Sequence, residues 1–238
     1  MTPLVNTMLF VVLPYLVVTV GVLGSAYRFA VRPFSYSSLA SQFLEGDRQF
    51  YGATSFHYGV LVLLAGHLAA LLFPETLLHW NGVPLRLYLL ETTGLAFAVL
   101  TAFGLGVSIF RRLSSSLLRQ VTSRADWFLL ALLAVQVGTG MVVALTCRWG
   151  SSWFAASLAP YLRSLVALNP NPAGVAAMPV AVRIHVVAAF LLVGVVPFSR
   201  LVHVLVVPVF YLWRRPLVFR WWRQPGNADR LSELRKEE

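Results

Sequence analysis

Charged residues are scarce in this chain of 238 residues, since Asp, Glu, Lys and Arg make up 12% of it and 58% is hydrophobic. A soluble domain carries about 25% charged residues, and the mean hydropathy of this chain is +0.73. The composition therefore excludes an ordinary soluble protein and predicts an integral membrane protein. No polar segment is long enough for a second core, so we expect one membrane domain over residues 1–213 and a basic tail over 214–238.

Cysteine is rarer still, because Cys147 is the only one in the sequence. A single cysteine excludes an intrachain disulfide, a CxxCH site for a c-type haem, and an iron–sulfur cluster held by the cysteines of this chain alone. The formal net charge is +10, a value also found in nucleic-acid-binding proteins. Here the arginines cluster at the ends of apolar runs, where they act as membrane topology signals, so we expect no nucleic-acid partner.

Long apolar runs are abundant and predict an all-α membrane bundle of five transmembrane helices. The runs cover about residues 5–27, 53–73, 87–110, 127–145 and 183–215. Each is long enough for the roughly 20 residues that a helix needs to cross the hydrocarbon core. Pro14 predicts a kink in the first span, and we expect a helix along the membrane surface around residues 152–168.

The distribution of basic residues predicts the orientation of the bundle. The side richer in Lys and Arg normally faces the cytoplasm. That side would hold Arg28, Arg32, Arg48, Arg111, Arg112, Arg119, Arg124 and the tail from Arg214 to Lys236. The opposite side would hold Arg86, Arg148, Arg163 and Arg183. We therefore expect the N-terminus outside and the C-terminus in the cytoplasm, in a multi-pass protein of the cell inner (cytoplasmic) membrane.

Four of the five histidines fall inside predicted spans, where an unpaired polar ring is costly. His57 and His67 lie ten residues apart in the second span, which corresponds to a rise of about 15 Å along an α-helix. His185 and His203 lie eighteen residues apart in the fifth span, on one helix face and about 27 Å apart. Because the two spans run in opposite directions, we expect His67 near His185 and His57 near His203.

Each pair could clamp one planar cofactor, with two neutral imidazoles as axial ligands of a haem iron. The two ideal rises differ, so this interpretation requires tilted helices or a bend at Pro197. Zinc is an alternative, although its structural sites need four ligands at one point. A proton relay is another alternative, and Glu91 is the only carboxylate inside a predicted span that it could use.

Several short motifs, spread over nearly the whole chain, point to one protein family. They are LPYL, SQFL, FHYG, GH, RRL, RAD, RIH and, as the most specific, PFSRLVHVLVVPVFYL. With these motifs and the two histidine spacings, the chain resembles the membrane cytochrome b subunit, or gamma subunit, of respiratory nitrate reductases.

The resemblance implies five spans and two b-type haems. It assigns His67 and His185 to the outer (distal) haem, and His57 and His203 to the cytoplasmic (proximal) haem. It further implies that quinol from the membrane quinone pool is oxidised near the distal haem. Electrons would then pass to an iron–sulfur (beta) subunit and a molybdenum (alpha) subunit that reduces nitrate. The chain would thus act as the electron-transfer subunit of an oxidoreductase in nitrate respiration.

Other candidate site residues lie close to these histidines in the sequence. Haem propionates need cationic partners, for which Arg183 is the candidate at the distal haem and Arg111 and Arg112 are the candidates at the proximal one. Plain topology signals are an equally good interpretation of Arg111 and Arg112. For the quinol pocket we expect His67, Gly66 and Arg86, since a glycine lets a ring approach the backbone closely. The family often has a lysine in this outer loop, and this sequence has none.

Two rival functions stay open. A cytochrome b subunit of another quinone-linked complex, such as a sulfur-compound or heterodisulfide-type reductase, would have similar site chemistry. A haem-free structural membrane anchor would leave the paired depths of the histidines unexplained. The subunits that purify together with this chain would separate these alternatives.

Overall fold

The computed structural model describes residues 2–31 and 48–205, which form helices and short connections. Five helices in this part of the chain are long and apolar enough to cross a membrane: Pro3–Val31, Tyr51–Leu72, Pro84–Ser114, Arg124–Thr146 and Val180–Phe198. The prediction of an all-α protein with five membrane spans is confirmed for these residues. Most of the segment between the first two predicted spans and all of the basic tail lie outside the described residues, so the division into two domains stays a prediction.

The first span changes its helical form around a proline. It consists of α1 (Pro3–Thr7), a π-helical turn (Met8–Val12) and α2 (Leu13–Val31). Pro14 has no N–H to offer the carbonyl of Phe10 four residues earlier, so the α-helical ladder cannot continue regularly there. The Tyr161 hydroxyl donates a hydrogen bond to this carbonyl at 2.8 Å. The predicted kink at Pro14 therefore corresponds to a π-helical turn whose free carbonyl finds a partner.

The second and third spans, α3 (Arg48–Leu72) and α5 (Pro84–Ser114), pack side by side. Gly104 makes this close approach possible. A Cβ at Gly104 would run into the backbone nitrogen of Phe56 and would lie 2.7 Å from the Gly52 carbonyl oxygen. The two backbones thus meet where no side chain separates them, as small residues allow in membrane helices.

Further along the same contact, Gly59 lies against the backbone of α5, and a Cβ there would be 2.8 Å from the nitrogen of Thr101. Not all glycines of α5 act in this way. The spaces beside Gly94 and Gly106 are open to 4 Å. Gly104 therefore permits the close approach of the two helices, whereas Gly94 and Gly106 make no such contact.

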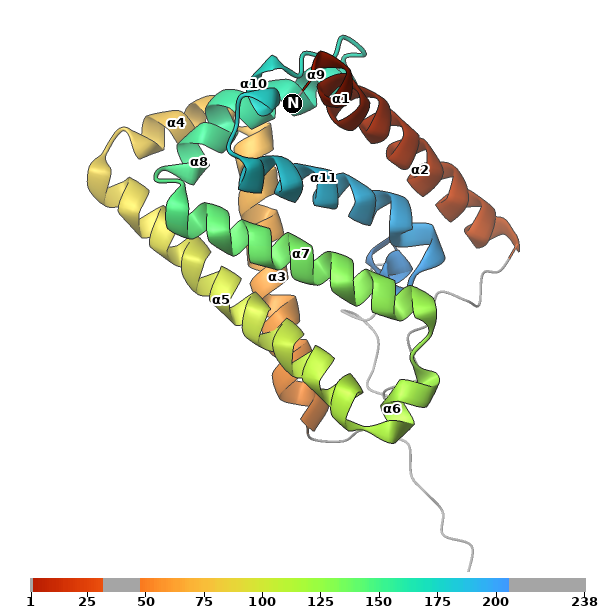
Figure 1. The fold of residues 1–238 in the computed structure, drawn as a ribbon. Helices are drawn as coiled ribbons and strands as arrows, with labels where there is room; N and C mark the ends of the chain where they lie inside the picture. Colours follow the sequence, from red (N-terminus) through yellow and green to blue (C-terminus); the bar gives the residue numbers. More distant parts are fainter. Residues whose placement is uncertain (1, 32–47, 206–238) are drawn as a thin grey trace, which may run out of the picture. The chain divides into compact units, whose positions relative to one another are not determined.

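The remaining spans continue a row of neighbours (Figure 1). Helix α5 packs on α7 (Arg124–Thr146), α7 packs on α11 (Val180–Val195), and α11 packs on α2. At the last contact, a Cβ on Gly21 would be 2.9 Å from the Val193 carbonyl oxygen. Helix α3, which carries His57 and His67, and α11, which carries His185, therefore belong to different helix pairs in this row.

One end of the bundle, called here the α9 end, gathers the shorter helices. They are α4 (Pro74–Asn81), α8 (Gly150–Trp153), a π-helical turn (Phe154–Leu158), α9 (Ala159–Val166) and α10 (Ala173–Ala176). The predicted helix around residues 152–168 is thus present. A buried cluster lies at this end: Phe10, Tyr161, Leu165, Val175, Met178, Val182 and Val186. The opposite end, called the α6 end, contains α6 (Ser116–Val121) between α5 and α7.

The fifth span is broken after α11. That helix ends at Val195 and is followed by a 3-10 turn (Val196–Phe198), an extended Ser199 and a second 3-10 segment (Arg200–Leu205). The prediction that one continuous α-helix carries both His185 and His203 is therefore wrong. The predicted bend at Pro197 is confirmed, because proline removes a backbone donor and clashes with the preceding turn.

Candidate functional site

The structure brings the four histidines of the predicted spans together in two pairs. The ring centres of His67 and His185 are 6.4 Å apart, and those of His57 and His203 are 6.2 Å apart. A metal held between two imidazoles by bonds of about 2 Å would separate the ring centres by about 6 Å. Each pair is therefore spaced to hold one metal ion between its rings. On two unbroken α-helices, His57 and His67 would be about 15 Å apart and His185 and His203 about 27 Å apart. The break in the fifth span allows both pairs to form despite this difference.

Three of these rings are fixed by hydrogen bonds to main-chain carbonyl oxygens. His57 contacts Ala53, His67 contacts Leu63 and His203 contacts Arg200, through Nδ1 at 2.7, 2.7 and 2.6 Å. A carbonyl oxygen only accepts, so Nδ1 is the donor in each of these hydrogen bonds and Nε2 is the ring nitrogen left for a ligand. Metal-binding histidines commonly bond their second ring nitrogen to the protein in this way.

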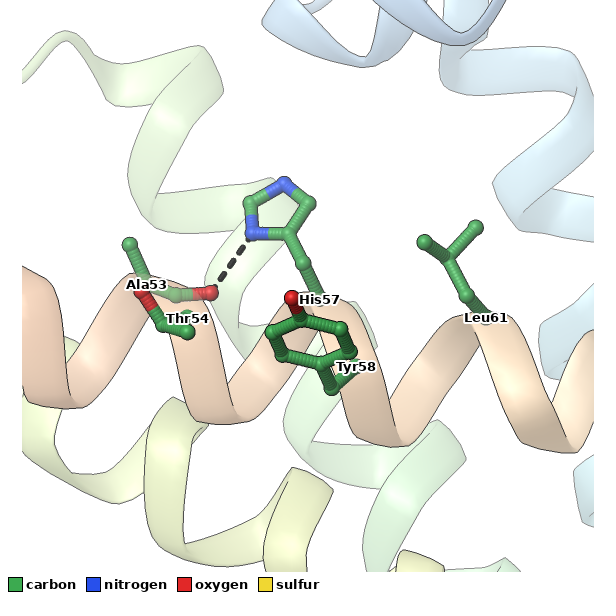
Figure 2. Close-up of a pocket in the computed structure, with 5 residues that line it drawn as sticks. All are labelled: Ala53, Thr54, His57, Tyr58 and Leu61. Carbon is green, nitrogen blue, oxygen red and sulfur yellow. Dashed lines mark hydrogen bonds between the residues drawn. The ribbon is translucent and has the colours of Figure 1, made fainter.

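His57 projects from α3 over an open pocket with a volume of about 520 Å³. The pocket is lined by Ala53, Thr54, His57, Tyr58 and Leu61. Figure 2 shows the imidazole standing off the helix, with Nδ1 turned back to Ala53 and the other nitrogen turned away from the backbone. Mostly apolar atoms surround the free nitrogen of His57 in this pocket. The edge of a flat and largely apolar group could lie against them while this nitrogen acts as a ligand.

The donor set also fits a haem better than zinc. Each pair offers two imidazole nitrogens, which is the number of axial positions on a haem iron. Within residues 2–31 and 48–205, no three His, Cys, Asp or Glu side chains are grouped to hold one ion. A structural zinc site needs four ligands at one point, so the two histidine pairs fit axial ligation.

His185 differs from the other three rings because a neighbouring helix holds it. Its Nδ1 lies 3.0 Å from the Gln136 carbonyl oxygen and 3.2 Å from the Thr139 hydroxyl, both on α7. A Cβ at Gly140 would lie 2.9 Å from the Cε1 atom of this ring. One face of α7 therefore shapes the place in which the His185 ring sits.

The Gln136 side chain approaches the other nitrogen of the same ring. Its Nε2 lies 3.1 Å from His185 Nε2, so the amide donates to the lone pair that a metal would use. Ligation of a metal by His185 therefore requires this amide to turn aside. The histidine pattern does not predict Gln136 or Thr139, although they are the only amide and hydroxyl side chains in the apolar run 127–145.

The residues proposed for a quinol pocket are not all brought together. The space beside Gly66 is open to 4 Å, so Gly66 leaves an accessible strip of α3 next to His67. Arg86 instead places its guanidinium over the Trp80 ring, 5.0 Å from the ring centre. The His67 ring packs edge to face on Phe154, with the ring centres 5.3 Å apart. Phe154 is thus an additional neighbour of His67 that the histidine spacing does not reveal.

The arginines proposed as propionate partners lie at the expected ends. Arg183 is half-buried on α11, two residues before His185. Arg111 and Arg112 lie in the last turn of α5, at the α6 end, and Arg112 donates to the Ser108 carbonyl at 3.1 Å. No ligand contact follows from these positions, so their role stays a prediction.

Similarity to known proteins gives evidence about this chain that does not depend on the geometry of the histidine pairs. A family described as "Nitrate reductase gamma subunit" matches residues 6–222. The chain is 29% identical over 213 residues to the nitrate reductase gamma chain of Bacillus subtilis (strain 168), covering 88% of this chain and 95% of that one. It is 28% identical over 216 residues to the respiratory nitrate reductase 1 gamma chain of Escherichia coli (strain K12), again covering 88% and 95%.

A third relative is a much longer protein. The chain is 25% identical over 222 residues to the nitrate reductase-like protein NarX of Mycobacterium tuberculosis (strain ATCC 25618 / H37Rv). The match covers 91% of this chain and 34% of that protein. The whole bundle is therefore shared, whether it forms most of a protein or one part of it.

Proposed function

The chain belongs to the nitrate reductase gamma subunit family, and we propose that it is the cytochrome b subunit that carries electrons from quinol to the nitrate-reducing subunits. The single observation that carries this proposal is the pairing of two histidines of α3 with His185 of α11 and His203 of the segment 200–205, at ring separations of 6.4 and 6.2 Å. The hydrogen bonds that tie Nδ1 of three rings to main-chain carbonyl oxygens, and the family relation, both agree with it. A structural anchor would need none of these features.

Two haems b are the proposed cofactors. Each of them, when bound, would accept and donate one electron at a time. His67 and His185 would hold the haem nearer the α9 end, and His57 and His203 the one nearer the α6 end. The main chain of α3 and of the segment 200–205 sets the rotation of three rings through their Nδ1 atoms. Arg183 would pair with propionates at the first site, and Arg111 and Arg112 at the second.

The proposed orientation places the α6 end in the cytoplasm and the α9 end outside. Arg111, Arg112, Arg119 and Arg124 lie at the α6 end, around α6. The positive-inside rule favours this arrangement. The iron–sulfur and molybdenum partners would dock at the α6 end, and the basic tail from residue 214 would belong to the same side.

Quinol would be bound and oxidised at the α9 end, beside His67. Gly66 leaves the backbone of α3 open there, and an apolar ring could lie against it. The Phe154 ring packs edge to face on the His67 ring and limits its rotation. Arg86 adds positive charge at this end from its position over Trp80, and its proposed role is therefore an indirect one.

Purification of the chain with its neighbours tests this function. We expect a reduced spectrum of low-spin b-type haem, reduction of that haem by added quinol, and nitrate-dependent reoxidation when iron–sulfur and molybdenum subunits are present. A folded preparation without haem would overturn the proposal. Reoxidation by a sulfur compound or a heterodisulfide instead of nitrate would keep the cytochrome and replace the terminal acceptor.

A further inference from the structure

The broken end of the fifth span is tied to the first span by one arginine. Arg28 on α2 donates through Nη1 to the carbonyl oxygens of Pro197 and Ser199, at 2.8 and 2.9 Å. These carbonyls have left the α-helical ladder, because α11 ends at Val195 and Ser199 is extended. A cationic donor shared by two such carbonyls forms the stronger, charge-assisted kind of hydrogen bond.

The same segment is tied to the fourth span by an ion pair. Arg200 Nε lies 3.1 Å from Asp126 Oδ1, and the Asp126 side chain is only 13% exposed. The other carboxylate oxygen of Asp126 accepts from the backbone nitrogen and the hydroxyl of Ser123, each at 3.0 Å. Ser123, at the start of α7, therefore holds the Asp126 carboxylate in the orientation in which it binds Arg200.

These two anchors converge on His203. The carbonyl oxygen that accepts from His203 Nδ1, at 2.6 Å, belongs to Arg200, the residue whose side chain binds Asp126. Arg28 fixes the backbone immediately before Arg200, at Ser199. His203 itself is exposed, and it lies in a 3-10 segment whose hydrogen bonds are weaker than those of an α-helix.

We propose that Arg28 and Asp126 are positioning residues that hold the broken end of the fifth span so that His203 Nε2 faces His57. The inference rests on the proposed function, because it concerns the haem assigned to this pair. Partners of metal-bound histidines set ring orientation, and their loss typically lowers metal affinity by about 10- to 100-fold. Without the anchors, the turn at Ser199 leaves His203 free to swing away from His57.

The test compares two arginines that make the same kind of contact at opposite ends of the bundle. Arg163 donates to the carbonyl oxygens of Leu71 and Leu72, both at 3.0 Å, and is the matched control. Haem loss from the purified protein to excess apomyoglobin would be followed for each haem. The spectral component missing in His203→Ala identifies the haem of interest.

In Arg28→Ala we expect that haem to be lost about tenfold faster, with the other haem unchanged. Its low-spin electron paramagnetic resonance signal, which depends on the mutual orientation of the two imidazole planes, would shift. Arg28→Lys would restore part of the retention, because an ammonium group can still donate to these carbonyls. Arg163→Ala would leave this haem as in the unmodified protein.

Other outcomes overturn the inference. Equal acceleration for both haems would indicate general destabilisation, and no change for either would show that His203 is placed without Arg28. If Arg28→Ala fails to fold, Asp126→Asn takes its place, since an amide oxygen can still cap α7 while the charge facing Arg200 is lost. The same selective effect is expected there, and its absence counts against the proposal. An unmodified protein without two haems would instead overturn the proposed function.

Discussion

The two histidine pairs are held in different ways. At the α9 end, His185 sits against Gln136, Thr139 and Gly140 of α7, and His67 packs on Phe154. At the α6 end, His57 and His203 are both exposed, and each is fixed by a hydrogen bond to its own stretch of main chain. A neighbouring helix thus holds one ring, His185, whereas the other three, His67 included, are bonded to their own main chain. Only at the α6 end do charged residues anchor the segment that carries a ring.

The difference shows that one sequence pattern can be supported by two kinds of structure. A ring packed against a neighbouring helix can move only if that helix moves, because the contacts are tertiary. A ring held by local backbone depends on whatever fixes that backbone. Substitutions on α7 should therefore act on the His67/His185 site, whereas substitutions around the break in the fifth span should act on the His57/His203 site.

The largest effect is expected from removing a ligand at the α9 end. His185→Ala should remove one haem and abolish quinol oxidation, because no second imidazole faces His67 there. Haem content and quinol-dependent reduction of the remaining haem would be measured together. Retention of both haems would contradict the pairing.

A methyl group at Gly140 should damage the α9-end site selectively. A Cβ there would lie 2.9 Å from His185 Cε1, so Gly140→Ala should displace the ring. Overpacking of this kind costs about 1–3 kcal/mol, and haem affinity at this site would fall about tenfold or more. Gly138→Ala is the matched control, since the space beside Gly138 is open to 4 Å. Equal effects of the two substitutions would show that Gly140 does not shape the site.

A substitution at the contact between α3 and α5 should affect the His57/His203 site more than the His67/His185 site. Gly104→Ala should push α3 away near Phe56, the residue next to His57, and lower the free energy of unfolding by about 1–3 kcal/mol. The His57/His203 haem should be lost faster than the other. Thermal unfolding in detergent and haem retention measure this, and Gly106→Ala, beside open space, is the control. A similar loss in the control would contradict the packing explanation, because Ala favours a helix more than Gly does and does not by itself destabilise α5.

The smallest effect is expected from removal of the Thr139 hydroxyl. Thr139→Val removes the contact at 3.2 Å to His185 Nδ1 while the Gln136 carbonyl still accepts from that nitrogen. Loss of one hydrogen bond costs about 1 kcal/mol, which corresponds to a factor of about five in affinity. Potentiometric titration should show a shift in the haem at the α9 end alone. A shift confined to the other haem would reverse the assignment.

Much of the bundle is predictable because membrane spans are specified by local composition. Apolar length predicts all five spans, since every backbone group in a bilayer must be bonded within its own helix. The histidine spacings and opposite helix directions predict which rings become neighbours. Pro197 predicts where the fifth span bends, because proline disrupts the helix through its own chemistry.

The remaining features depend on contacts between distant parts of the chain. Gln136 and Thr139 contact His185 only because α7 lies against α11. Arg28 and Asp126 bind the broken segment only because it passes near both of their helices. The full interruption of the fifth span after Val195 needs partners for the freed carbonyls, which Arg28 supplies. Spacing along one helix cannot reveal such partners, and an ideal rise therefore does not describe the path from His185 to His203.

The central claim is that each histidine pair holds one haem. Its most direct test is the ratio of haem to protein in the purified chain, in His203→Ala, and in the double variant His185→Ala/His203→Ala. We predict ratios of about two, one and none, because a metal between two imidazoles loses an axial ligand with either residue. Two haems retained in the double variant, with the protein folded, would contradict the claim.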